Sequence, residues 1–170
     1  LEPVDDVDPY VEFMGWRPTE FADLRTMRAA PLPLVMSTDR DITARFAMAH
    51  VITNLADLDR IGVDPEWTLA DYYVVDNDID ASATGGPGDG FGFAPISTFH
   101  SRVKDAFYGV FDGRDYTIHD LTIAYPPDAS MNETDDVGMF RGLAWDAIVR
   151  NLRFENAVVT GVDHLGVLAG

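Results

Sequence analysis

Three glycine-bracketed pentapeptides in the C-terminal half of the chain constrain its fold more than any other feature. They read GVFDG, GMFRG and GVLAG, and they begin at Gly109, Gly138 and Gly166, 29 and then 28 residues apart. Short strands that recur at a fixed interval of about 20 to 50 residues are typical of solenoids, in which each turn pairs its backbone with the next. The spacing therefore predicts an all-β solenoid with one strand and one corner per pentapeptide.

Apolar residues inside the pentapeptides are expected to point inward and to stack on one another. The pattern aligns Val110 or Phe111 with Met139 or Phe140, and these with Val167 or Leu168. The glycines suit corners where φ is positive or where no side chain can be accommodated. The predicted structural repeat residues are Gly109, Phe111, Gly113, Gly138, Phe140, Gly142, Gly166, Leu168 and Gly170. The alternative is an antiparallel sandwich in which the pentapeptides match by chance.

Segments around the pentapeptides predict further elements. TNLADLDRIG (53–62) has an apolar stripe at helical spacing, with Thr53 or Asn54 as N-cap and Gly62 as its end. DYYVVDNDIDAS (71–82) indicates a strand, and GGPGDGFG (85–92) indicates a loop. Downstream, Leu121 and Ile123 match Leu152 and Phe154 as a second repeated strand.

Residues 1–48 differ from the rest and predict an irregular N-terminal arm before a domain at 49–170. The first residues mix acids, apolar residues and prolines, which suits an extended segment. Apolar residues in 18–30 have helical spacing, and 41–52 alternates as a strand does.

From about residue 51 to residue 170, the order of motifs resembles the GLUG-repeat proteins. The resemblance rests on NLADLDRI, YYVVDNDIDAS, FYGVFDGRDYTIHDLTI, VGMFRGL, IVRNLRFENAVVTG and LGVLAG. It implies a right-handed parallel β-helix and a role in bacterial surface proteins or adhesins. Arg114 stands where the family usually has Asn, Asp115 where it has Gly, and Arg141 where it has a small residue. An open end of such a fold exposes strands, so we expect a longer chain or a homo-oligomer.

The strongly acidic composition excludes several partners. Asp and Glu number 29 against 12 Lys and Arg, for a formal net charge of −17. Such a surface repels nucleic acid and anionic membranes, and no apolar run approaches the roughly 18 residues of a membrane span. Adaptation to high salt would explain this composition. The alternative is the ordinary acidic amino-acid usage of a GC-rich genome. The chain has no cysteine, which excludes disulfides.

One acidic run suggests a calcium site. In DNDID, Asp76, Asp78 and Asp80 alternate on one face of the expected strand, and Asp89 in the following loop could add a ligand. The run does not match an EF-hand, and a solvated acidic face is the alternative. Beyond possible Ca²⁺, the sequence predicts no cofactor.

Catalysis is the less favoured hypothesis. β-Helix enzymes that cleave polysaccharides use carboxylates with a basic residue, and a mixed cluster of this type occurs in the sequence. Its members are Arg102, Asp112, Arg114, Asp115, His119 and Asp120. The sequence favours a non-enzymatic surface or assembly module, extracellular or on the cell surface, that binds a protein or glycan. A virion decoration or tail-fibre component is one alternative, and a polysaccharide lyase or glycoside hydrolase is the other.

Overall fold

The computed structural model describes residues 8, 10–18, 42–86, 91–96, 106–125 and 136–170. The chain divides into two compact units, Leu1–Ala49 and His50–Gly170. Ten strands, one six-residue α-helix and one 3₁₀ turn make up the regular structure of the described residues, so the predicted all-β class is confirmed.

In the first unit, an antiparallel strand pair replaces the predicted irregular arm. Strand β1 (Val11–Pro18) pairs with β2 (Ile42–Ile52) from Val11 opposite Met48 to Pro18 opposite Ile42, with a bulge after Phe13. The ring of Phe13 packs on that of Phe46 at 5.5 Å, a cross-strand contact that local sequence does not reveal. The strand predicted at 41–52 is confirmed, whereas residues 19–30 of the predicted helix lie outside the described residues.

The second unit begins with the predicted helix. Helix α1 (Leu55–Arg60) is capped by Asn54, whose side chain accepts a hydrogen bond from the Asp57 backbone N–H. Asp57 in turn accepts from the backbone N–H and hydroxyl of Thr53, which completes a reciprocal cap. Leu58 is buried by this helix in the core of the unit.

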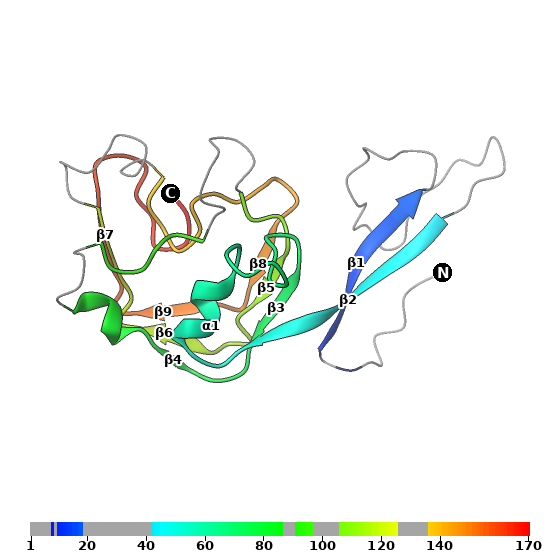
Figure 1. Cartoon of the computed structure of the whole chain (residues 1–170), viewed down its shortest axis with the longest axis horizontal. Helices are drawn as coiled ribbons and strands as arrows, with labels where there is room; N and C mark the ends of the chain where they lie inside the picture. The colour runs from blue at the N-terminus through cyan, green and yellow to red at the C-terminus, as the bar shows by residue number, and fades with distance from the viewer. Residues whose placement is uncertain (1–7, 9, 19–41, 87–90, 97–105, 126–135) are drawn as a thin grey trace. The chain divides into compact units, whose positions relative to one another are not determined.

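Parallel strand pairs join three successive repeats of the second unit. The first ladder contains β3 (Tyr72–Val75), β5 (Val110–Asp112) and β8 (Ile148–Arg150). The second contains β4 (Ile79–Asp80), β6 (Thr117–His119) and β9 (Arg153–Glu155), and the third pairs β7 (Thr122–Ala124) with β10 (Val158–Thr160). The three ladders lie on different sides of a common core, with α1 over it (Figure 1). An antiparallel sandwich is therefore wrong for these strands.

The repeat interval is 38 residues along the first ladder, not the predicted 28 or 29. Tyr72 pairs with Val110, and Val110 pairs with Ile148. Phe111 consequently pairs with Val149, and the predicted pairing of Phe111 with Phe140 is wrong. The rings of Phe111 and Phe140 still touch, with centroids 5.6 Å apart, because they meet inside the core from different sides.

The second and third pentapeptides lie side by side, although Phe140 bridges Ala169 and not the predicted Leu168. Val137 forms a parallel bridge with Leu165, which places Gly138 beside Gly166, and the Phe140 N–H donates to the Leu168 carbonyl at 2.9 Å. The first pentapeptide instead contains β5 and therefore lies in the first ladder, on a different side of the core.

Two further predicted strands need correction. Ile118 pairs with Phe154, and Ile123 pairs with Val159, so the match of Leu121 and Ile123 to Leu152 and Phe154 is wrong by several residues. The strand expected over 71–82 breaks between Val75 and Ile79, because the chain turns a corner there. The loop expected at 85–92 follows a short 3₁₀ turn, Ser82–Gly85, and its residues 87–90 lie outside the described part.

Five of the six pentapeptide glycines are needed for close backbone approach rather than for positive φ. A Cβ at Gly113 would lie 2.6 Å from the Leu152 Cα, and a Cβ at Gly138 would lie 2.6 Å from the Gly166 carbonyl oxygen. Similar clashes occur at Gly109, Gly166 and Gly170. Gly142 is the exception, since a Cβ there would make only an ordinary 3.8 Å contact with Ala106.

Burial decreases along the repeats. The central side chains of the second repeat, Phe111, Ile118 and Ile123, are fully buried. Their partners in the third repeat, Val149, Phe154 and Val159, are only partly buried although they pack on the same core. Among the described residues, the third repeat thus forms the less covered edge of the core.

Candidate functional site

The densest polar contacts in the described residues lie at one corner of the repeats. We call this the polar corner: the connections 76–78, 113–116 and 151–152, which join the first ladder to the second, together with the strand residues beside them. Carboxylates, guanidinium groups and an amide from three repeats meet there because the ladders stack these connections.

Asp112 is the centre of the polar corner and is 7% exposed. Its Oδ1 accepts hydrogen bonds from the Arg114 backbone N–H at 2.9 Å and from the Asn151 amide at 3.0 Å. Its Oδ2 accepts from Arg150 Nε at 2.8 Å. Burial raises the pKa of Asp112, but these hydrogen bonds and the Arg150 charge outweigh burial, so that its pKa lies below the ordinary value. Asp112 is therefore held ionised as a structural acceptor.

Three ion pairs of the polar corner join each repeat to the next, and in each pair the aspartate belongs to the earlier repeat. Arg114 contacts Asp76 at 3.2 Å, Arg150 contacts Asp112 at 2.8 Å, and Arg153 contacts Asp115 at 2.8 Å. In every pair the arginine follows the aspartate by 38 residues. The acid of one repeat thus meets a base of the next, and the pairing reinforces the register that the backbone sets.

The predicted calcium ligands do not converge. Asp76 pairs with Arg114, Asp78 accepts from the Thr117 backbone N–H at 2.8 Å, and Asp80 accepts from the Ser82 N–H at 2.9 Å. The hydrogen bonds from Ser82 lower the pKa of Asp80. Within the described ranges, no group of three His, Asp or Glu side chains is arranged to hold a metal ion. Asp89 lies outside the described residues, so a site that includes it stays a prediction.

The cluster proposed for catalysis is also occupied by structural contacts. His119 Nδ1 lies 3.3 Å from Glu155 of the next repeat, and Asp120 adopts a left-handed corner conformation with φ of 57°. Arg102 lies outside the described residues. The remaining members belong to the cross-repeat ion pairs already given.

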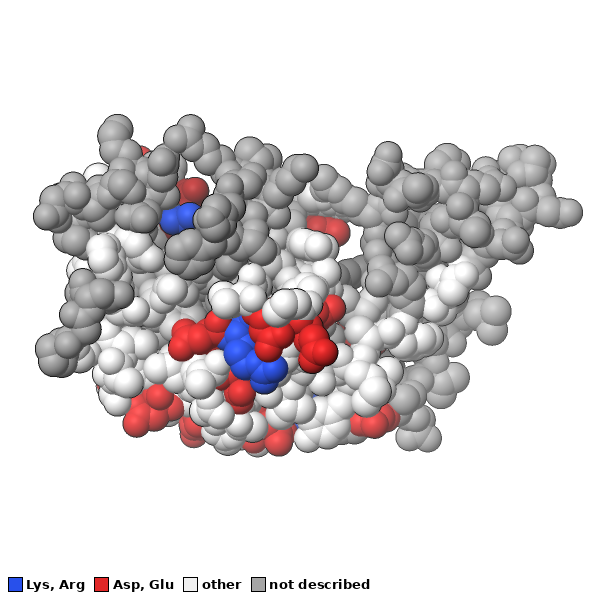
Figure 2. All heavy atoms as spheres, in the orientation of Figure 1, with Lys and Arg blue, Asp and Glu red and all other residues white. Residues whose placement is uncertain are grey.

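Acidic side chains also gather near α1. Figure 2 shows them around a basic group on the visible face of the second unit. Arg60 donates to Asp64 from Nε at 3.1 Å and from a terminal nitrogen at 2.8 Å, and its guanidinium lies 4.0 Å from the centre of the Trp67 ring. Burial raises the pKa of Asp59 on the same helix.

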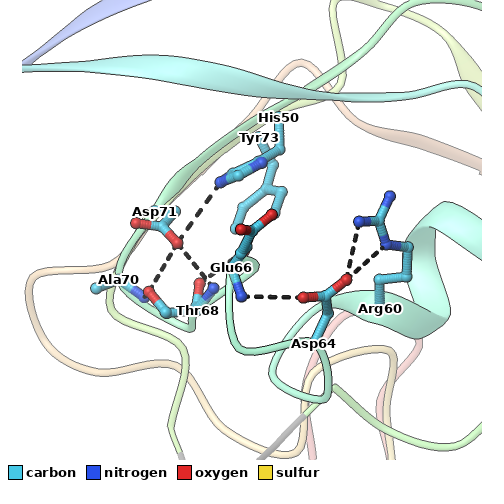
Figure 3. A network of polar contacts seen from close by, with 8 residues as sticks. All are labelled: His50, Arg60, Asp64, Glu66, Thr68, Ala70, Asp71 and Tyr73. Carbon is cyan, nitrogen blue, oxygen red and sulfur yellow. Dashed lines mark hydrogen bonds and ion pairs between the residues drawn. The ribbon is translucent and has the colours of Figure 1, made fainter.

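An aromatic and polar network lies beneath this region (Figure 3). The rings of His50, Trp67 and Tyr73 pack against one another, with centroids 4.8 Å (His50–Trp67), 5.3 Å (His50–Tyr73) and 5.8 Å (Trp67–Tyr73) apart. The His50 Nε2 lies 3.7 Å from Asp71. The Tyr73 hydroxyl donates to the Thr68 carbonyl at 2.7 Å. Burial, reinforced by the Asp71 and Asp64 carboxylates, raises the pKa of Tyr73 far above its ordinary value. Tyr73 therefore stays protonated at neutral pH.

Two exposed aromatic residues are the remaining candidates for ligand contact. Trp145 is 72% exposed and Tyr108 is 45% exposed, and they follow the bridged residues Leu143 and Phe107. Elsewhere in the described part of the second unit, Phe93 is buried at 2% exposure, and Tyr116 and Tyr125 are partly buried against the core.

Sequence reasoning missed the left-handed corner residues. Asp120 and Asn156 follow the paired residues His119 and Glu155, and their φ angles are 57° and 55°. Asp136 and His164 form a second such pair, with an ion pair of 3.1 Å between them. Asn and Asp tolerate this conformation better than other residues with a side chain, so their recurrence was an available signal.

Comparison with known proteins gives one informative relative. The chain is 37% identical over 122 residues, 71% of its length, to halomucin of Haloquadratum walsbyi. It spans about 1% of the length of that protein. No family model matches, and no solved structure matches. In the described part of the chain, no helix is long and apolar enough to cross a membrane.

Proposed function

We propose that this chain is a non-enzymatic module of a surface or extracellular protein, built as a right-handed parallel β-helix of the GLUG-repeat type. Its role is to present a rigid body for attachment to a protein or a glycan. The observation that carries the proposal is the set of three parallel ladders around one core, with inward residues repeated every 36 to 39 positions. Repeats that pair only with their neighbours make extended, rigid surfaces.

Two further observations support this role. The partial match to halomucin supports a surface or extracellular location. The carboxylates proposed for catalysis are bound into contacts between repeats, and Tyr73 is held protonated, so the described polar clusters favour structure over chemistry. A polysaccharide-cleaving enzyme and a virion component remain the competing hypotheses.

Surface labelling and glycan binding together test the proposal. Antibodies against the chain are expected to label intact source cells before permeabilisation. Purified protein is expected to be retained by a glycan or by cell-surface protein without releasing reducing ends or unsaturated sugars, with or without Ca²⁺. The Trp145→Ala variant, compared with Val63→Ala as a control at another exposed apolar site, tests the aromatic contact. Glycan cleavage would refute the non-enzymatic role, and labelling only inside cells or in virus particles would refute the surface role.

A further inference from the structure

The outer edges of the third repeat present an unusually regular pattern of backbone groups. Ile148 N–H donates to Gly109 and the Arg150 carbonyl accepts from Gly113, so both residues bond inward to the second repeat. Val158 and Thr160 behave the same way on β10, where Val158 donates to Leu121 and Thr160 accepts from Tyr125. In a parallel strand, alternate residues bond to opposite neighbours. The N–H and C=O groups of Val149 and Val159 therefore face outward.

Strand β9 follows the same rule. Arg153 donates to the Tyr116 carbonyl and Glu155 accepts from the Asp120 N–H, so the backbone groups of Phe154 face outward. Within the part of the chain that the structure describes, no strand pairs with the outer edges of β8, β9 and β10. The three residues whose backbone groups face outward, Val149, Phe154 and Val159, have apolar side chains that are partly buried against the core. Edges of this kind are templates for pairing with another strand.

Charge is also nearly balanced at this edge. Residues 146–170 contain the acids Asp146, Glu155 and Asp163 and the bases Arg150 and Arg153, which gives −3 + 2 = −1 out of the total of −17. The electrostatic repulsion that opposes contact between two copies is therefore weak at this edge despite the overall charge. Three of the large exposed apolar side chains belong to the same region, Val158, Val162 and Leu165, and a fourth, Trp145, directly precedes it.

Strand β9 is complementary to itself. Arg153 and Glu155 flank Phe154, and their side chains are 62% and 61% exposed. A two-fold axis through Phe154 would pair β9 antiparallel with its copy, and the two Phe154 residues would exchange both backbone hydrogen bonds. Arg153 would then lie opposite Glu155 of the other copy, twice, and opposite charges across a strand pair are stabilising. The same axis would pair β8 with β10 of the other copy, Val149 opposite Val159.

We propose that the third repeat is a docking surface for a second copy of this chain, joined edge to edge by a two-fold axis at Phe154. The contact is isologous, which is the commonest arrangement in soluble homodimers. The inference depends on the edge geometry and stands apart from the proposed surface role.

Sedimentation velocity on the full 170-residue chain tests this proposal. We expect a monomer–dimer equilibrium between micromolar and millimolar concentration. Arg153→Glu and Glu155→Arg each place like charges opposite one another, and each should raise the dimer Kd roughly tenfold. The charge-swapped double variant R153E/E155R should restore dimerisation. It cannot restore the contacts within the chain to Asp115 and His119, so recovery distinguishes docking from a structural effect.

Hydrogen exchange gives a second readout that needs no variant. The amides of Val149, Phe154 and Val159 should become protected as concentration rises, while the already bonded amide of Val158 should not change. A monomer at all concentrations would overturn the proposal. So would a dimer in which these three amides exchange unchanged, or a double variant as weak as the single ones.

Discussion

Asp112 and Arg150 join the second and third repeats by a hydrogen bond of 2.8 Å between Oδ2 and Nε. Their backbones are directly paired in the first ladder, and 38 residues separate them in the sequence. Asp112 is buried, while the Arg150 side chain is 40% exposed. Burying a carboxylate is costly unless it is paired, and the contact with Arg150 offsets part of that cost.

Asp112→Asn should lower the free energy of unfolding by about 1 to 3 kcal/mol at neutral pH, because charged hydrogen bonds are lost around a buried group. The pKa of Asp112 is depressed in the fold, so its contribution is complete above the unfolded value of 3.8 and is lost as the pH falls through the folded value. The variant should therefore approach the wild type in stability below about pH 4.

Urea unfolding at pH 7 and at pH 3, followed by tryptophan fluorescence, measures this difference. Asp115→Asn is the matched control, because its pair with Arg153 has the same spacing but both side chains are more than 60% exposed. We expect it to change stability by less than about 0.5 kcal/mol. Equal effects of the two variants would contradict the role given to Asp112.

Gly113→Ala should destabilise the fold by about 1 to 3 kcal/mol, because the added Cβ overlaps the backbone at Asn151 and Leu152. Gly142→Ala adds the same methyl group where only an ordinary contact with Ala106 results. Alanine restricts the unfolded chain more than glycine does. Gly142→Ala should therefore be as stable as the wild type or up to about 1 kcal/mol more stable. Thermal unfolding of the two variants should separate clearly, and similar losses would refute the close approach at Gly113.

Asp115→Gly should stabilise the corner relative to Asp115→Ala by about 1 kcal/mol, because position 115 has φ of 65°. Both variants remove the exposed pair with Arg153, so their difference isolates the backbone conformation. Glycine is also the residue that the resembling family usually has at this position. Chemical denaturation of both proteins provides the comparison, and an alanine variant as stable as the glycine variant would show that position 115 is not strained.

Added sodium chloride should raise the melting temperature. The net charge of −17 repels itself, and the screening length falls from about 10 Å at 0.1 M to about 3 Å at 1 M salt. Salt also weakens the cross-repeat ion pairs, but exposed pairs contribute little, so relief of repulsion should dominate. A melting temperature that falls between these salt concentrations would show that the ion pairs outweigh the net charge.

Calcium should leave the melting temperature unchanged, because Asp76, Asp78 and Asp80 already accept from different donors. Scanning calorimetry with excess Ca²⁺ and with EDTA measures this directly. A calcium-dependent rise that is abolished in Asp89→Asn but not in Asp136→Asn would instead establish the predicted site.

Some elements could be predicted because their signals are local. The cap at Asn54 and the alternation in 42–52 define helix and strand without reference to the rest of the chain. Register could not be predicted in this way, because strands of three residues carry little pattern and the connections between them differ in length. Four residues, 113–116, separate β5 from β6, whereas two, 151–152, separate β8 from β9.

The polar corner was visible only in part. The Asp-rich run was recognised, but the arginine partner of its Asp76 lies 38 residues away, as do the partners of Asp112 and Asp115, and a wrong interval concealed all three. The partner of β1 is also remote in sequence, which is why a strand beginning at Val11 was not expected.

The decrease in burial from the second repeat to the third implies a direction of unfolding. In the described part of the chain, strands or loops pack on both sides of Phe111, Ile118 and Ile123, whereas Val149, Phe154 and Val159 have a paired strand on one side. Unfolding should accordingly begin in the third repeat, proceed to the second, and reach helix α1 last. Pairing two such molecules at the third repeat would remove the weak starting point from both of them at once.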